Sequence, residues 1–112
     1  MRVLFLTEKD TKTLLSMSEV MEAVEGAFRE KALGYVQMPP KVYLSYEKYN
    51  GDLRAMPSYL ERLEISAVKV VNSHPDNPGK FGLPTVMATI ILVDPRNGEP
   101  LAIMSGAWIT AM

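Results

Sequence analysis

The chain has 112 residues, of which 47% are hydrophobic and 22% are charged, so its composition is that of one globular domain and excludes a disordered segment. Its 12 Lys and Arg residues nearly balance its 13 Asp and Glu residues, giving a formal net charge of -1, which disfavours nucleic acid and anionic membrane surfaces as partners. There is no cysteine, which excludes disulfides and thiolate metal sites and fits a cytoplasmic location, and the longest apolar run, residues 86–93, is too short for a membrane-spanning helix.

The first elements expected along the chain are a short strand and a long helix. Residues 2–6 form an apolar run that stops at polar residues, as a first strand does. From Ser16 onward apolar residues recur at helical spacing, which predicts a helix over residues 18–33. Ser16 followed by Glu19 predicts a capping box at its start, and Gly34 suits a left-handed end.

The rest of the chain has the pattern of extended strands separated by turns. Strands are expected at residues 42–46, 52–60, 65–71, 85–93 and 101–104. Asn50 and Gly51 indicate a tight hairpin turn between the first two of these strands, and Pro57 places the second at a sheet edge or near its own end. Residues 72–82 have the composition of a loop, and residues 94–98 that of the turn of a second hairpin.

Together these elements predict an α+β fold. The expected architecture is a mixed, largely antiparallel sheet of five or six strands with one main helix. Residues 85–93 are nearly all apolar, as in a central strand covered on both faces. The last segment, residues 107–112, predicts the start of a helix that has no terminal cap. We therefore expect residues 1–112 to be one domain, truncated from a longer protein.

Lys69 is the most unusual residue in the predicted sheet. Strand alternation places it on the same face as Ile65, Ala67 and Val71. An ammonium group in that setting needs a carboxylate partner, the loss of its own proton, or a wet cleft in which an anionic ligand supplies the opposite charge. A structural lysine paired with a glutamate and a ligand-binding lysine therefore both remain open from the residues alone.

Three further residues are candidates for a binding site. Arg54 and Met56 lie two residues apart on one predicted strand and so share a face, where the guanidinium can hold a carboxylate and the methionine can line a pocket. Lys41 directly follows a rigid pair of prolines. The plainer alternatives are surface cations and a core methionine. His74 has no second histidine at ligand spacing, so we expect a loop residue and no metal site.

Several short motifs, taken in order, are similar to the N-terminal part of the ornithine cyclodeaminase/mu-crystallin family. They are Leu14-Leu15-Ser16-Met17, Met38-Pro39-Pro40-Lys41, Gly51 with Met56-Pro57, Val68-Lys69-Val70-Val71, Gly82-Leu83-Pro84-Thr85, Asp94-Pro95 with Gly98, Pro100-Leu101-Ala102 and Ile109-Thr110-Ala111. The resemblance implies that residues 1–112 are a substrate-binding and dimerisation domain whose sheet joins its copy in a dimeric, barrel-like assembly. A Rossmann domain for NAD(H) or NADP(H), and an arginine for the substrate carboxylate, would follow downstream. Because residues 1–112 contain no glycine-rich dinucleotide motif, we expect no cofactor bound to them alone.

The resemblance also implies roles for the candidate residues. Lys69 matches the family's active-site lysine, which contacts the substrate carboxylate and assists proton transfer. Lys41 stands where many members have an arginine for the same carboxylate, and Met56 matches a methionine of the substrate pocket. Arg54 stands where the ornithine-cyclising members place a glutamate, so it would repel the distal ammonium of ornithine.

The implied function is that of an NAD(P)-dependent amino-acid oxidoreductase similar to alanine dehydrogenase. It would act as a homodimer on a small amino acid or 2-oxo acid, with residues 1–112 inert alone. One alternative keeps the family and changes the reaction, to cyclodeamination of ornithine to proline and ammonia or to reduction of a cyclic ketimine. Another is small-molecule binding without catalysis, as mu-crystallin-like proteins can do.

Overall fold

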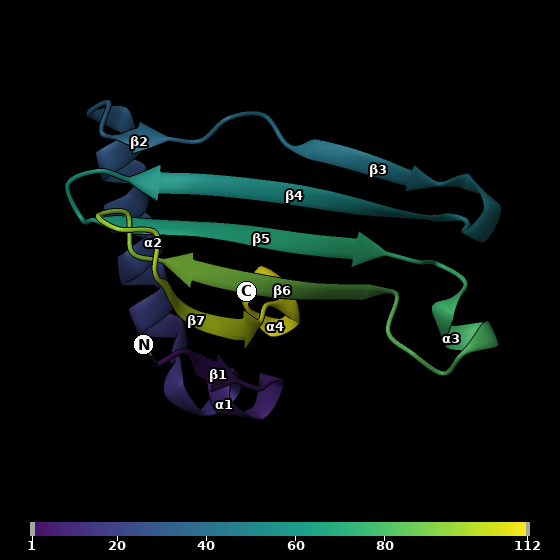
Figure 1. Ribbon diagram of the computed structural model, residues 1–112. Coiled ribbons are helices and arrows are strands. Elements are labelled where there is room, and N and C mark those ends of the chain that lie inside the picture. Colours follow the sequence, from purple (N-terminus) through teal and green to yellow (C-terminus); the bar gives the residue numbers. More distant parts are fainter. Residues whose placement is uncertain (1, 112) are drawn as a thin grey trace.

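A seven-stranded sheet forms the body of the molecule (Figure 1). The structure, a computed structural model, describes residues 2–111. The strands are β1 (Leu4–Leu6), β2 (Val36–Gln37), β3 (Val42–Tyr46), β4 (Gly51–Leu60), β5 (Ile65–Ser73), β6 (Val86–Val93) and β7 (Pro100–Ser105). Their order is β1-β7-β6-β5-β4-β2, with β3 also paired to β4. In this part of the chain the β1–β7 pair is parallel and the other pairs are antiparallel.

The α+β class and the mixed, mostly antiparallel sheet are confirmed, but the predicted strand number of five or six was wrong. The additional strand is β2, in which Val36 and Gln37 pair with the end of β4. A strand of two residues has no alternation to detect, so the sequence pattern could not reveal it. The remaining six strands are the ones expected, with ends shifted by up to two residues.

Helices occupy both ends of the chain and the loops between strands. They are α1 (Glu8–Leu14), α2 (Met17–Ala32), the 3₁₀ turn η1 (Glu47–Tyr49), α3 (Asn77–Lys80) and α4 (Ala107–Ala111). The prediction of one main helix was therefore wrong, because α1 precedes α2. The loop expected over residues 72–82 is also shorter, since β5 extends through Ser73 and α3 occupies four of the remaining residues. The final helix is α4, described as far as Ala111; Met112 lies outside the described residues.

The caps of α1 and α2 follow from side chains just before each helix. Thr7 and Asp10 form a reciprocal capping box on α1, and the hydrogen bonds from Thr7 lower the pKa of the Asp10 carboxyl. At α2, Ser16 accepts a hydrogen bond from the backbone N–H of Glu19 as predicted. The glutamate carboxylate, however, accepts from the Ser16 hydroxyl at 2.8 Å, so the predicted capping box is only half formed. Gly34 ends the helix with φ +86°, the left-handed conformation expected there.

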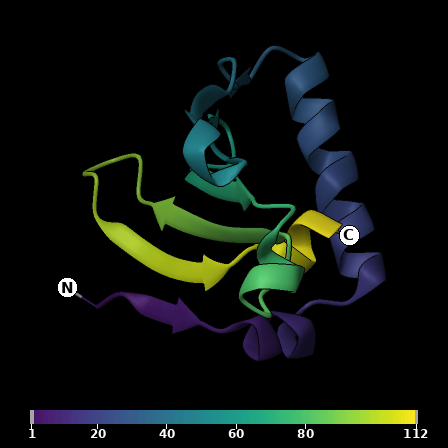
Figure 2. The same cartoon turned by 90° about the vertical axis from the view of Figure 1, so that its right-hand side faces the viewer.

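The two faces of the sheet differ in what stands beside them. Alternation and register place Arg54, Met56, Lys69 and Ile90 on one face, called the lysine face. This is the side on which α2 and α4 stand (Figure 2). The opposite face carries mainly apolar strand residues. Val68, Val70 and Ile91 lie at its centre.

The sheet has little buried core within residues 2–111. Ala88 and Ala102 are its buried apolar residues, and every residue of β4 is half-buried. The expectation that residues 85–93 are covered on both faces is not met inside this part of the chain, because Val86 and Met87 are exposed. None of the helices described here is long and apolar enough to cross a membrane.

Candidate functional site

Three of the four candidate residues line one hollow on the lysine face. The cavity has a volume of about 520 Å³ and is called the lysine hollow. Lys41, Met56 and Lys69 line it, as the prediction of a shared site requires. The other lining residues are Met38, Pro39, Pro40, Pro57 and Ser58.

The lysine hollow lies where prolines interrupt the sheet. On one side of the interruption Gln37 pairs with Tyr59, and on the other side Val42 pairs with Ala55. Four residues, 38–41, therefore stand opposite three, 56–58, with no ladder between them. Three of these seven residues are proline, which has no N–H to donate to a ladder. The unpaired stretch leaves the space that the hollow occupies.

The same interruption explains why the placement of Pro57 was mispredicted. Pro57 is not at a sheet edge or at the end of its strand, because it lies in the middle of β4 and pairs with Val68 of β5. The unpaired stretch gives it a local edge inside the sheet, so its missing N–H breaks no ladder hydrogen bond to β2 or β3.

Lys69 reaches the hollow from the neighbouring strand. Met56 and Lys69 are direct cross-strand partners, so their side chains lie side by side on the lysine face. No ion pair joins Lys69 or Lys41 to a carboxylate in the described part of the chain. The paired structural lysine that the residues alone left open is therefore not found within residues 2–111. Two ammonium groups beside apolar prolines and methionines form a setting that favours an anionic ligand.

Arg54 lies beside the hollow and does not line it. It shares the face of Met56, as predicted, but its guanidinium donates to Asp52 from Nε at 3.2 Å and from Nη2 at 3.4 Å. The same group lies 5.4 Å from the centre of the Tyr43 ring. Its side chain is 40% exposed. The structure thus brings Lys41, Met56 and Lys69 together and holds Arg54 one step further along β4.

Met38 and Ser58 are lining residues that the sequence analysis missed. Ser58 follows Met56 by two residues, so strand alternation alone puts it on the lysine face. Met38 opens the Met-Pro-Pro-Lys motif, of which only Lys41 was selected. Neither residue is charged, so neither stands out in the sequence as a candidate for binding an anion.

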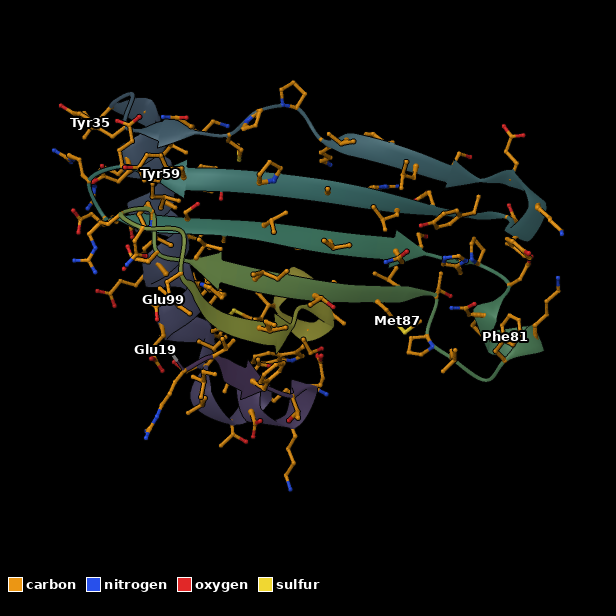
Figure 3. The ribbon with its side chains drawn as sticks, in the orientation of Figure 1. Glu19, Tyr35, Tyr59, Phe81, Met87 and Glu99 are labelled. Carbon is orange, nitrogen blue, oxygen red and sulfur yellow. The ribbon has the colours of Figure 1, made fainter. Side chains whose placement is uncertain are left out.

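His74 belongs to a different part of the molecule. It contributes to a surface with Phe81 and Met87, which lie at the end of the sheet opposite α2 (Figure 3). Its ring stacks on Tyr46 with centroids 5.8 Å apart and packs so closely on Gly51 that a side chain there would collide with it. Its packing against Tyr46 and Gly51 therefore explains why a histidine stands at this position.

The start of α4 is fixed on the lysine face close to Lys69. Glu8 accepts a hydrogen bond from the backbone N–H of Trp108 at 2.7 Å and another from the hydroxyl of Ser105. Gly106 approaches Ile90, where an added Cβ would lie 2.9 Å from Cγ1. Because Ile90 is the cross-strand partner of Lys69, α4 begins one strand away from the lysine hollow.

Comparison with known proteins gives matches along the whole chain. The model of the ornithine cyclodeaminase/mu-crystallin family matches residues 1–112. The chain is 54% identical to an alanine dehydrogenase of Archaeoglobus fulgidus over 112 residues, which is 100% of this chain and 33% of that protein. It is 31% identical to a Delta(1)-pyrroline-2-carboxylate reductase of Bacillus cereus over 108 residues, 96% of this chain and 33% of that protein. The chain thus spans about a third of the length of these curated relatives.

Solved structures agree with the sequence matches. An archaeal alanine dehydrogenase dimer with bound NAD superposes with a TM-score of 0.93 at 54% identity, covering 99% of this chain and 33% of that one. The Thermococcus litoralis Delta(1)-pyrroline-2-carboxylate reductase in complex with NADH and L-proline gives a TM-score of 0.93 at 49% identity, covering 97% of this chain and 33% of that one.

Proposed function

The chain belongs to the ornithine cyclodeaminase/mu-crystallin family, and from that premise we propose that it is the substrate-binding part of an NAD(H)-dependent alanine dehydrogenase. The observation that carries the proposal is the pair of lysines that share one hollow without a carboxylate partner among residues 2–111. The similarity of all 112 residues to a third of an alanine dehydrogenase supports it. The reaction converts pyruvate, ammonium, NADH and a proton into alanine, NAD⁺ and water.

The described residues do not by themselves fit a dinucleotide. Within residues 2–111 no glycine-rich turn leads from a strand into a helix, which is the usual cradle for a pyrophosphate. We therefore propose that residues 1–112 form an N-terminal substrate-binding domain and that the nicotinamide, which supplies the hydride, is held by a separate domain further along the protein. Residues 1–112 alone should be inert, and hydride transfer by this segment would contradict that arrangement.

In the proposed mechanism the two lysines hold the substrate carboxylate. Lys41 follows two rigid prolines and Lys69 lies in the middle of β5, so the carboxylate is held between two positioned cations. An ammonium is a point charge without the fork of arginine, so the pair attracts the carboxylate without fixing its plane. Met56 and the prolines exclude water beside it. We assign to Lys69 the proton transfer at the substrate nitrogen, while the α-carbon exchanges the hydride with the nicotinamide.

Arg54 is proposed to limit the choice of substrate. A distal ammonium, such as that of ornithine, would meet a like charge on this side of the hollow. Both carboxylate oxygens of Asp52 already accept hydrogen bonds from Arg54, so the pair offers no free carboxylate to such a group. The arrangement favours small neutral amino acids.

The direct test is an assay of the complete enzyme with pyruvate, ammonia and NADH. Oxidation of NADH that depends on both other substrates is expected, and a lack of turnover with any 2-oxo acid would reject the proposal. Ornithine with NAD⁺ in place of these substrates should release no ammonia.

A second candidate function is reduction of a cyclic imino acid. It is favoured by the relative at 49% identity whose structure holds NADH and L-proline. In this case Delta(1)-pyrroline-2-carboxylate, NADH and a proton would give proline and NAD⁺. A higher kcat/KM for this imine than for pyruvate with ammonia would make it the principal activity.

We propose in addition that the enzyme is a homodimer joined through the opposite face of the sheet. Val68, Val70 and Ile91 give that face an apolar centre that residues 2–111 leave half-buried. The archaeal relative is a dimer. Pairing two such faces would bury them, as in the barrel-like assembly expected from the resemblance.

A further inference from the structure

A second hollow lies under α2, next to the lysine hollow. Its volume is about 210 Å³, and it is called the helix hollow. From α2 it is lined by Val24, Ala27, Phe28 and Lys31, and from the sheet side by Val36, Met38, Ser58 and Leu60. Lys31 and Ser58 are its polar residues, so its interior is set mainly by apolar side chains.

The two hollows adjoin each other. Met38 and Ser58 line both of them, so one pair of side chains forms the boundary between them. Serine is small and methionine is flexible, so this boundary can yield to a ligand, whereas a branched or aromatic residue there would block it. A molecule whose carboxylate lies at Lys41 and Lys69 can therefore extend past Ser58 without leaving the lysine face.

The helix hollow suits an apolar group larger than a methyl. A cavity of roughly 150 Å³ lined by leucine, isoleucine and phenylalanine holds benzene in another protein, and the helix hollow is larger than that. Phe28 and Val24 are 66% and 46% exposed, so a bound hydrocarbon group would remove their surface from water. A cationic group would meet the like charge of Lys31 and would find no carboxylate among the lining residues.

We propose that the helix hollow is a side-chain subsite, and that the enzyme accepts amino acids and 2-oxo acids with branched apolar side chains as well as alanine and pyruvate. This inference rests on the proposed function, since it takes the two lysines as the carboxylate site. The α-carboxylate lies between Lys41 and Lys69, the side chain passes Met38 and Ser58, and its end lies against Ala27 and Phe28. The reaction and its stoichiometry are those given above.

The experiment compares pyruvate with 4-methyl-2-oxopentanoate in the complete enzyme, each with ammonia and NADH. Ala27→Leu fills the helix hollow from α2 and leaves Lys41 and Lys69, which line the other hollow, unchanged. Ala23→Leu makes the same change on the same helix at a residue that does not line the hollow, and it serves as the matched control. We expect turnover of both acids by the natural enzyme. Ala27→Leu should lower kcat/KM for the branched acid by about tenfold or more and change that for pyruvate less than twofold. Ala23→Leu should alter neither.

Each other outcome bears on one proposal or the other. Turnover of pyruvate without turnover or binding of the branched acid overturns the subsite and leaves the dehydrogenase proposal intact, as does an equal loss for both acids in Ala27→Leu. If no 2-oxo acid is turned over, the dehydrogenase proposal fails. Calorimetric titration of the natural enzyme and Ala27→Leu with 4-methyl-2-oxopentanoate then decides the subsite alone: weaker binding to the variant supports it, and equal or absent binding rejects it.

Discussion

At the scale of single residues, the proposed binding of an anion in the lysine hollow depends on two lysines that have no carboxylate partner within residues 2–111. Lys69 comes from the middle of β5 and Lys41 from the unpaired stretch before β3, so they approach the same space from two separate segments. Lys41 is exposed and Lys69 is half-buried, so a ligand from solvent can reach both ammonium groups. Two like charges beside one hollow attract an anion, which is the physical reason to expect one there.

Lys69→Ala in the complete enzyme is expected to lower kcat/KM for pyruvate by about 100-fold or more, because it removes both a carboxylate contact and the proposed proton donor. Lys69→Arg should restore the KM for pyruvate more than it restores kcat, since arginine keeps the charge but does not release a proton. Lys80→Ala, a lysine on α3 at the other end of the sheet, is the control. Unchanged kinetics in Lys69→Ala would remove this residue from the mechanism.

Arg54→Glu should open the enzyme to ornithine. The substitution replaces repulsion of the distal ammonium by attraction, and we expect kcat/KM for ornithine to rise by about tenfold or more relative to that for alanine. Arg54→Gln, which removes the charge without reversing it, should show a smaller rise. The measurement is ammonia release together with proline formation. If both variants treat ornithine as the natural enzyme does, Arg54 does not face the substrate.

Asp94 should make the fold sensitive to acid. The side chain and backbone N–H of Arg96 donate to its carboxylate, which lowers the pKa of Asp94 from 3.8 to about 2. A lowered pKa means that the contribution to stability is complete above pH 3.8 and is lost as the pH falls towards 2. Asp94→Asn should therefore be less stable than the natural protein at neutral pH, with a difference that shrinks below about pH 4 in denaturant unfolding. Glu99→Gln, on the same hairpin, should leave the acid dependence as it is.

At the scale of elements, an ion pair between a mostly buried glutamate and a half-exposed arginine ties α2 to the sheet. The Glu30 carboxylate, 11% exposed, accepts two hydrogen bonds of 2.8 Å from Arg62 in the β4–β5 turn, and these bonds lower the pKa of Glu30 and raise that of Arg62. The Arg62 guanidinium also lies 4.3 Å from the centre of the Tyr35 ring. This contact matters because Phe28 and Met21 on the same helix are mostly exposed and add little packing within the described residues.

Arg62→Met should loosen α2 and lower the thermal midpoint of the complete protein by a few degrees, because it leaves the buried Glu30 carboxylate without its partner. Arg29→Met, a substitution on α2 itself, provides the matched control. That arginine pairs with Glu25 at 3.6 Å with side chains 66% and 76% exposed, so its removal should change the midpoint little. Hydrogen exchange in α2 should rise in the first variant only. Equal thermal midpoints for Arg62→Met and Arg29→Met would contradict the claim that the Glu30–Arg62 ion pair holds α2 against the sheet.

The elements also show which features of the fold can be predicted from sequence patterns. Alternation over residues 42–46 predicted β3 to the residue, and it placed Lys69 and Met56 on faces that the register bears out. It failed for β2, which is too short to alternate. It also failed for Pro57, whose position depends on how two distant segments align against β4. Local periodicity carries no information about such alignments.

For the candidate site, too, some residues could be predicted from the sequence and others could not. Charge in an apolar strand identified Lys69, strand alternation selected Met56, and the rigid pair of prolines selected Lys41. The resemblance then implied a role for each, and all three line one hollow. The partnership of Arg54 with Asp52 was missed, although the two residues are only two apart on one strand and so share a face. Ser58 was missed because a serine in a strand is ordinary by itself.

At the scale of the whole molecule, the sheet leaves one apolar face without cover in residues 2–111. Val70→Lys, in the middle of the opposite face, is expected to convert the complete enzyme from dimer to monomer, because it places a charge in the apolar centre of the proposed interface. Ser45→Lys, on β3 of the same sheet but on the lysine face, should leave the dimer intact. Analytical ultracentrifugation distinguishes the two. A dimeric Val70→Lys variant would exclude this face as the interface.

The link between Glu8 and Trp108 has a consequence for the order in which the protein is built. The two residues are 100 positions apart, and β1 pairs in parallel with β7, so the first strand cannot take its place until residues 100–105 have left the ribosome. The hairpins β4–β5 and β5–β6 join near neighbours and should form well before. Pulse-labelled hydrogen exchange during refolding should find β1 protected after β5.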